Sequence, residues 1–327
     1  MSRCLVGVSG GIDSLFAAIK LQEDGFDVYA LHMYLNSKSQ IPETAKKVLS
    51  DHRIKLLYAD YTNEFNRYVV DYFTNEYAKG YTPNPCVVCN RDVKLPFLFK
   101  EAESRGIETI ATGHYADRDE NGLIIRHKSR KDQSYFLACV DRDILKHTIF
   151  PLKDFAKEEI RKALGLNTKD SSDLCFVKNN YRDILKEKLG TKKGEIVKQN
   201  KVVGYHTGFY NYTIGQRKGI QIGSKPHYVV SIDARKNIVY ADEETKLYSR
   251  EFYLDNLKLL KEKTFFKNRI LECVVRYNAK PKPCRIDLMK KRVVLLEAER
   301  AVTPGQVAVF YENDKVVGCG KIDYGIH

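Results

Sequence analysis

The chain has 327 residues, of which 43% are hydrophobic and 30% charged, a composition typical of a soluble globular protein with two or three domains. Its apolar runs are far shorter than the roughly 20 residues of a membrane helix, which argues against a membrane-spanning helical protein. The formal net charge of +13 favours a polyanionic partner, nucleic acid first, although a lysine-rich composition alone also produces such a charge. Because the amino-terminal residues lack signal-peptide features, we expect a cytoplasmic protein with reduced thiols and no membrane partner.

Short apolar runs alternate with helical stretches in the first half of the chain, a pattern typical of a parallel sheet covered by helices. Strands are predicted over residues 3–8, 28–34, 55–60 and 109–116. Helices are predicted over residues 14–24, 94–105 and 158–166. These elements predict an α/β domain with a doubly wound parallel sheet over residues 1–178.

The sequence changes character after residue 178. A predicted helix at 181–189 leads into a segment rich in glycine and tyrosine, so we predict a small central domain over 179–248. The aromatic and cationic residues of 205–218 suit either stacking on RNA or packing in a loop-rich core. The remainder, 249–327, is predicted to form an antiparallel β-barrel, with strands at 269–277, 283–289, 291–298, 306–312 and 315–323.

The hexapeptide Ser9-Gly10-Gly11-Ile12-Asp13-Ser14 directly follows the first predicted strand and opens a helix. Glycines let backbone amides approach phosphates closely, and a helix amino terminus favours an anion. The pattern is neither a Walker P-loop nor G-x-G-x-x-G, and it resembles the PP-loop of ATP pyrophosphatases. Asp13 would hold Mg²⁺ or orient the phosphates. A tight strand-to-helix turn without a ligand is the alternative.

Three cysteines stand out in polar surroundings. Cys86 and Cys89 form a C-x-x-C between prolines and Asn90, and Cys175 follows a serine-rich stretch. We expect exposed loop thiols there, because a nearby cation can lower the pKa of such a thiol and make it reactive. His114 lies near the carboxyl end of the predicted strand 109–116, where open α/β sheets bind their ligands. It either contacts phosphates or forms hydrogen bonds with backbone groups.

Eight segments in a fixed order are similar to the tRNA-specific 2-thiouridylases of the bacterial MnmA type, essentially from end to end. They are SGGIDS, GYTPNPCVVCN, ATGHYA, KDQSYFL, SSDLCF, GYHTGFYNYTIGQRKGI, VVRY and AVTPGQVAVFY. The resemblance implies ATP-dependent 2-thiolation of the wobble uridine in the tRNAs for Lys, Glu and Gln. In that reaction the C2 oxygen is adenylated, and sulfur then displaces AMP. The base must leave the stack to be reached.

The same resemblance implies roles for individual residues. The nucleotide would be bound by Gly7, Val8, Ser9, Gly10, Gly11, Ile12, Asp13, Ser14, Met33 and Gly113. The tRNA would be contacted by Asn84, Pro85, Cys86, Lys131, Asp132, Gln133, Arg276 and Tyr277. Cys89 matches the nucleophilic cysteine of the family, and Cys175 matches the cysteine that carries a persulfide.

The chain departs from the family at Cys86, where an aspartate is usual. Three cysteines, Cys86, Cys89 and Cys175, suit a four-iron four-sulfur cluster with one open iron, as in related PP-loop thiolases. The alternative is a persulfide on Cys175 with Cys89 as its partner and Cys86 as a tolerated small residue. Zinc at the C-x-x-C would require further ligands. The sulfur donor is a desulfurase, a relay protein or sulfide. The rival functions are another ATP pyrophosphatase activity and a non-catalytic RNA-binding protein.

Overall fold

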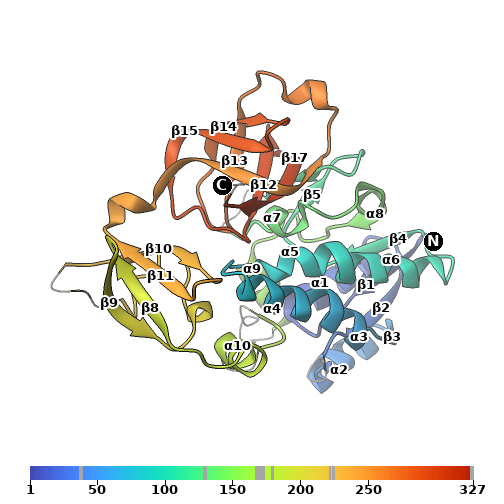
Figure 1. Cartoon of the computed structure of the whole chain (residues 1–327). Coiled ribbons are helices and arrows are strands. Elements are labelled where there is room, and N and C mark those ends of the chain that lie inside the picture. Colours follow the sequence, from blue (N-terminus) through green and yellow to red (C-terminus); the bar gives the residue numbers. More distant parts are fainter. Residues whose placement is uncertain are drawn as a thin grey trace. The chain divides into compact units, whose positions relative to one another are not determined.

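The chain forms two compact units, which are described separately (Figure 1). Unit 1 comprises Met1–Val70, Cys86–Phe176 and Asn313–Val316, and unit 2 comprises Asp71–Pro85, Val177–Glu312 and Val317–His327. The computed structural model describes residues 1–36, 40–127, 131–165, 174–177, 180–220, 222 and 225–324. None of the helices in this described part has the length and hydropathy of a membrane span.

A parallel sheet with the strand order β3-β2-β1-β4-β7 forms the centre of unit 1. Its strands are β1 (Arg3–Gly7), β2 (Asp27–Tyr34), β3 (Lys55–Asp60), β4 (Thr109–Thr112) and β7 (Thr148–Ile149). Successive side chains of a strand point to opposite faces, so Cys4 and Val6 pack in one hydrophobic cluster while Leu5 packs in the other. The predicted strands are confirmed, whereas β7 is too short to show a pattern in the sequence.

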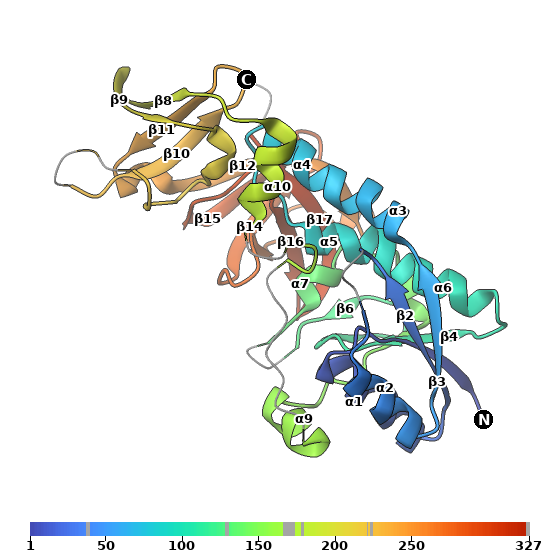
Figure 2. The same cartoon turned by 90° about the horizontal axis from the view of Figure 1, so that it is seen from below.

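Helices cover both faces of this sheet, which confirms the predicted doubly wound α/β fold. Helices α1 and α9 contribute to the cluster that contains Cys4, and α6 contributes to the cluster that contains Leu5; Figure 2 shows α1 and α6 on opposite sides of the strands. The helices of unit 1 are α1 (Ile12–Glu23), α2 (Glu43–Asp51), α3 (Thr62–Phe65), α5 (Pro85–Cys89), α6 (Leu95–Glu103), α7 (Ser134–Leu137), α8 (Arg142–Lys146) and α9 (Lys157–Leu164).

Two π-helical turns and a small hairpin complete unit 1. The π-helical turns span Asn66–Val70 and Asn90–Lys94, and the second joins α5 to α6. The hairpin pairs β5 (Asp117–Arg118) with β6 (Ile124–Ile125), and Ile125 pairs in turn with Lys315.

Unit 2 begins with a helical pair and a small sheet. Helix α4 (Asp71–Ala78) packs against α10 (Tyr181–Leu189) through the rings of Phe73, Tyr77 and Tyr181. The sheet has the order β10-β11-β8-β9. Its strands are β8 (Gly194–Lys198), β9 (Lys201–His206), β10 (Tyr228–Asp233) and β11 (Ile238–Asp242). The predicted helix at 181–189 is confirmed.

The remaining strands form an antiparallel β-barrel, also as predicted. The order is β12-β15-β14-β13-β16-β17, and pairing of β12 with β17 closes it. The strands are β12 (Tyr248–Leu259), β13 (Leu271–Val274), β14 (Lys282–Asp287), β15 (Arg292–Arg300), β16 (Val307–Glu312) and β17 (Lys315–Asp323). Strand β12 is absent from the predicted set because most of its side chains are polar or partly exposed. The three predicted domain boundaries stay a prediction.

Candidate active site

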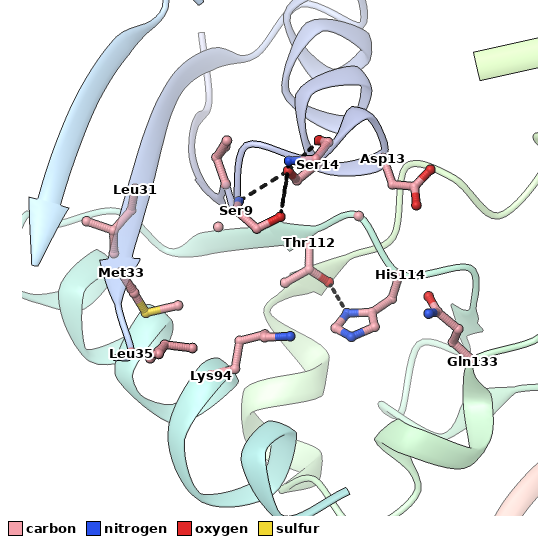
Figure 3. Close-up of a pocket in the computed structure, with 14 residues that line it drawn as sticks. Ser9, Asp13, Ser14, Leu31, Met33, Leu35, Lys94, Thr112, His114 and Gln133 are labelled. Carbon is pink, nitrogen blue, oxygen red and sulfur yellow. Dashed lines mark hydrogen bonds between the residues drawn. The ribbon is translucent and has the colours of Figure 1, made fainter. Parts of the chain in front are cut away.

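A cavity lies at the carboxyl ends of β1, β2 and β4 in unit 1, where open α/β sheets bind their ligands (Figure 3). Its lining includes most of the residues that were predicted to bind a nucleotide, namely Gly7, Val8, Ser9, Gly11, Asp13, Ser14, Met33 and Gly113. Gly10 and Ile12 are not among the residues that line the cavity. Gly10 adopts a φ of +86° in the turn, and Ile12 is buried in the core. The structure thus brings together residues more than 100 positions apart in the sequence.

Hydrogen bonds hold the glycine loop in a tight turn. The Ser14 hydroxyl donates to the Gly11 carbonyl at 2.9 Å, and the Ser9 amide donates to the Ser14 hydroxyl oxygen at 3.2 Å. Helix α1 starts at Ile12 with Gly11 as its N-cap, and no side chain caps it. Because the first amides of a helix lack intrahelical partners, this end of α1 is suited to a phosphate.

The end of β4 lies directly against the loop. A Cβ atom at Gly113 would come within 2.8 Å of the Asp13 carbonyl carbon and the Ser14 amide nitrogen. The next residue, His114, is hydrogen-bonded through Nδ1 to the Thr112 hydroxyl at 2.8 Å. Burial, with a smaller effect of Lys94, lowers the pKa of His114 to about 3. His114 is therefore a neutral side chain at the cavity wall, held by a side chain rather than by the backbone groups considered above.

The opposite side of the cavity is apolar. Leu31, Met33 and Leu35, from the end of β2, line it, and Figure 3 shows them across the cavity from Asp13. Apolar walls with a few placed polar groups are typical of small-molecule sites. The arrangement suits a nucleotide whose base contacts these three side chains and whose phosphates reach the glycine loop.

Asp13 is contacted by Lys131 of the KDQ segment and by Tyr115. Lys131 Nζ lies 3.1 Å from Asp13 Oδ2, and Tyr115 donates its hydroxyl proton to Asp13 Oδ1 at 2.7 Å. Gln133 lines the cavity and accepts a hydrogen bond from the Tyr115 amide at 3.0 Å. Two of the residues predicted to contact tRNA, Lys131 and Gln133, therefore lie beside the glycine loop.

The C-x-x-C lies on helix α5, and the expectation of exposed loop thiols is wrong for Cys89. Cys89 is buried, 7% exposed, whereas Cys86 is half-buried and Cys175 is exposed. Burial raises the pKa of Cys89 to about 12, and desolvation likewise raises the pKa of Cys175. Both shifts favour the protonated thiol over the thiolate. The serine-rich residues 171–173 before Cys175 lie outside the described residues.

Lys94 connects the cysteines with the cavity, although no sequence pattern described above singles it out. Its side chain extends into the cavity toward Thr112 and His114 (Figure 3). Its positive charge acts to lower the pKa of Cys89 and of Cys175, against the dominant effect of burial. The Lys94 backbone amide acts on the pKa of Cys89 in the same direction. The turn Asn90–Lys94 is π-helical, and its i→i+5 spacing brings the amide of Lys94 back to the backbone of Cys89.

The described residues do not offer the ligands that the predicted iron–sulfur cluster needs. No group of three or more His, Cys, Asp or Glu side chains in the described ranges is arranged to hold a metal ion. Cys86 and Cys175 are near enough to Cys89 to influence its pKa, but they do not converge as a ligand set. The described residues therefore do not support the predicted cluster.

The remaining residues that were predicted to contact tRNA are dispersed. Asp132 accepts hydrogen bonds from the His127 and Ser134 amides, at 2.9 and 3.0 Å, and so shapes its own loop. Asn84 immediately precedes α5, and Pro85 is the first residue of that helix. Arg276, in the barrel of unit 2, donates to the Arg300 carbonyl at 3.0 Å and lies next to the half-buried Tyr277. Their contacts with tRNA stay predictions.

A doubly wound domain with this glycine loop belongs to the class of nucleotide-binding α/β proteins. Residues 2–179 match the family described as tRNA methyl transferase HUP domain. Residues 182–242 match the tRNA methyl transferase PRC-barrel domain, and 249–322 match the aminomethyltransferase β-barrel domain. The three matches cover nearly the whole chain.

Curated relatives define the family more narrowly. Proteins named tRNA-specific 2-thiouridylase MnmA are 38% identical in Sulfurimonas denitrificans, over 98% of both chains, and 35% identical in Campylobacter jejuni, over 98% of this chain and 100% of the relative. The one in Carboxydothermus hydrogenoformans is 37% identical over 98% and 97%. A solved structure, described as a predicted subunit of tRNA methyltransferase from Methanocaldococcus jannaschii, has 16% identity to this chain and a TM-score of 0.35, over 50% of this chain and 76% of the other. The chain belongs to the tRNA-specific 2-thiouridylase family.

Proposed function

We propose that the protein uses ATP to activate the C2 oxygen of a tRNA uridine and then replaces that oxygen with sulfur. The observation that carries the proposal is the position of Lys94, which lines the nucleotide cavity and acts electrostatically on both Cys89 and Cys175. One cation thus connects the place where a phosphoryl group would be activated with the two thiols that would handle sulfur. By the family resemblance, the wobble uridine of the tRNAs for Lys, Glu and Gln is the expected substrate.

The matching domain descriptions name a methyl transferase, so methylation is the rival activity to weigh. A methyl group is transferred without phosphoryl activation, and it needs neither a glycine loop for phosphates nor a pair of thiols. Here the glycine loop, Asp13 and the basic side chains around it favour a nucleotide with phosphates. Cys89 and Cys175, on whose pKa values the cavity residue Lys94 acts, favour sulfur transfer over methyl transfer.

Activation requires that negative charge on the phosphates be neutralised. Mg²⁺ is held in proteins by one or two carboxylates together with substrate phosphates. Asp13 lines the cavity and would hold the ion only through an oxygen that Tyr115 or Lys131 contacts in the structure, so that contact would have to be released. When bound, the ion would stabilise charge on the phosphates. The amides at the start of α1 bind the same anion, and Gly113 keeps β4 close enough to support the loop.

We propose that Cys175 and Cys89 act as a pair in the sulfur step. Cys175 is exposed, which suits the receipt of the outer sulfur of a persulfide carried by a desulfurase or a relay protein, whose own thiol is released. Its outer sulfur would attack the activated C2 carbon, and AMP would leave with the former C2 oxygen. Cys89, buried nearby, would then attack the Cys175 sulfur to form a disulfide and leave the sulfur on the base. A later reductant restores the thiols, in keeping with a reducing cytoplasm.

The decisive experiment incubates the protein with undermodified tRNA, MgATP and a persulfide donor, and measures 2-thiouridine by mass spectrometry of digested tRNA. We expect thiouridine with the wild-type protein and none with Cys89→Ser or Cys175→Ser. Cys273→Ser is the matched control, because Cys273 is a buried thiol of the barrel core in unit 2. Methylated uridine in place of thiouridine would overturn the proposal. Absence of tRNA-stimulated ATP–pyrophosphate exchange would instead favour the non-catalytic RNA-binding function.

A further inference from the structure

Two lysines converge on Asp13 in the first turn of α1. Lys131 Nζ lies 3.1 Å from Asp13 Oδ2, and Lys157 Nζ, from the start of α9, lies 3.8 Å from the same oxygen. Tyr115 holds the other carboxylate oxygen by a 2.7 Å hydrogen bond. The ring of Tyr115 also lies 4.6 Å from the Lys131 ammonium, a cation–π distance. Three elements of unit 1 therefore place two ammonium groups at the glycine loop.

These two cations also lie beside each other. The side chains of Lys131 and Lys157 are within hydrogen-bonding reach, which brings like charges together. Burial lowers the pKa of Lys157 to about 8, with further contributions from Lys131 and Arg161, and the attraction of Asp13 opposes this only in part. The Lys157 side chain is 13% exposed, so water screens the repulsion weakly. An additional anion at this point would stabilise both ammonium groups.

The geometry of the cavity indicates which anion. Asp13 lies at one side of the cavity with Ser14, and Leu31 and Met33 lie at the other (Figure 3). A nucleotide whose base contacts the apolar side would direct its phosphates past the amino end of α1 toward Asp13. The distal phosphates of a triphosphate carry the charge that two lysines and a helix amino terminus recognise together.

We propose that Lys131 and Lys157 bind the β and γ phosphates of ATP and hold pyrophosphate until it leaves. The inference rests on the proposed function, in which uridine attacks the α phosphorus through its C2 oxygen and loses the N3 proton to solvent. The bond from the α phosphorus to the bridging oxygen breaks, and that oxygen leaves with the electron pair as part of pyrophosphate. Cations already in place stabilise the charge that develops there. This assigns Lys131 to the nucleotide, in contrast to the tRNA contact that the family resemblance implies.

A binding experiment separates these roles without any sulfur chemistry. Dissociation constants for ATP, AMP and inorganic pyrophosphate, each with Mg²⁺, are measured by calorimetry for the wild type, Lys131→Met and Lys157→Met. Loss of one charge-assisted contact is expected to weaken ATP and pyrophosphate binding about 10-fold or more and to change AMP binding less than about twofold. Lys157→Arg keeps the cation and should retain most of the ATP affinity. Lys162→Met is the matched control, because Lys162 is exposed on the same helix.

Three results would overturn the inference. ATP and pyrophosphate binding that is unchanged in both variants would show that the lysines do not contact these phosphates. An equal loss of ATP and AMP binding would point to a general distortion of the loop. A Lys131→Met variant that loses tRNA affinity but keeps both phosphate ligands would restore the tRNA role. If the lysine dependence holds but the wild type yields no thiouridine, the proposed function fails while the pyrophosphate site stands.

Discussion

Adding a methyl group at Gly11 tests whether the glycine loop is a phosphate cradle. Gly11 has φ −77° and ψ 152°, which an alanine adopts without strain. Its added Cβ would meet only the Ser9 hydroxyl oxygen, at the ordinary contact distance of 3.5 Å. Gly11→Ala should therefore change the unfolding free energy by less than about 1 kcal/mol, because alanine restricts the unfolded chain but is less favourable than glycine at the N-cap of α1.

The same methyl group lies at the cavity surface, where a phosphate would approach the amides that begin α1. Displacing the phosphate from one or two charge-assisted hydrogen bonds costs about 1.5–3 kcal/mol each, so ATP affinity should fall about 10-fold or more. Gly113→Ala provides the contrast. Its Cβ would lie 2.8 Å from backbone atoms of Asp13 and Ser14, so the loop itself must shift, at a cost of about 1–3 kcal/mol of folding stability.

Urea denaturation and ATP calorimetry on the two variants measure these effects. Gly204→Ala is the control for adding a methyl group, because its Cβ would have its nearest neighbour at 3.6 Å and lies on β9 of unit 2. The reasoning is refuted if Gly11→Ala binds ATP as tightly as the wild type. It is also refuted if Gly11→Ala loses more stability than Gly113→Ala, because the space around the two glycines predicts the opposite order.

Further predictions concern the thiols and the buried histidine. Lys94→Met should raise the pKa of Cys175 further and slow alkylation of its thiol by iodoacetamide at pH 8 severalfold, and Lys94→Arg should restore the rate. Equal alkylation rates in the wild type and both variants would show that Lys94 has no part in the sulfur step. Cys86→Asp, which restores the usual family residue, should keep thiolation activity. Anaerobically purified wild-type protein should contain no stoichiometric iron and sulfide. A bound cluster that is lost in Cys86→Ala would contradict the thiol-pair route. Because burial holds the pKa of His114 at about 3, below its unfolded value, the stability from the neutral imidazole is present above about pH 6.5 and is lost as the pH falls toward 3. His114→Gln should therefore show a smaller loss of unfolding free energy between pH 7.5 and 5 than the wild type, and an identical loss would show that His114 does not titrate in this way.

Local sequence patterns were sufficient for the parts of the molecule that depend on neighbouring residues. The turn after β1 needs glycine at Gly10, where φ is +86°, and the continuous runs of buried residues in β1 and β2 follow from a sheet covered on both faces. The barrel strands from β13 onward also give a local signal, in the form of short apolar runs in the sequence. Strand β12 lacks such a signal, because its pairing with β15 and β17 holds it in place although only Phe252 and Leu254 of its side chains are buried.

Contacts between distant segments could not be predicted in this way. Lys157 is 144 positions from Asp13 in the numbering of the chain, and only the packing of α9 against α1 brings them together. The C-x-x-C looked like a loop because prolines precede it, yet Pro85 is tolerated at the first position of α5. The burial of Cys89 follows from that helix. A cysteine motif in a sequence therefore indicates which atoms are present, but not their exposure or pKa.

Cys86 is the position at which the two sulfur mechanisms differ, because it is a ligand in the cluster mechanism and only a tolerated small residue in the thiol-pair mechanism. A cluster needs three thiolates that converge, whereas Cys86 is half-buried, Cys89 is buried and Cys175 is exposed within the described residues, without forming a ligand set. A thiol pair needs only one accessible sulfur, one protected sulfur and a cation that stabilises a thiolate when it forms. Cys175, Cys89 and Lys94 supply these three features. Because Lys94 also lines the nucleotide cavity, binding of an anionic phosphate there would compete for its charge, so the reactivity of the thiols is expected to depend on the state of the nucleotide.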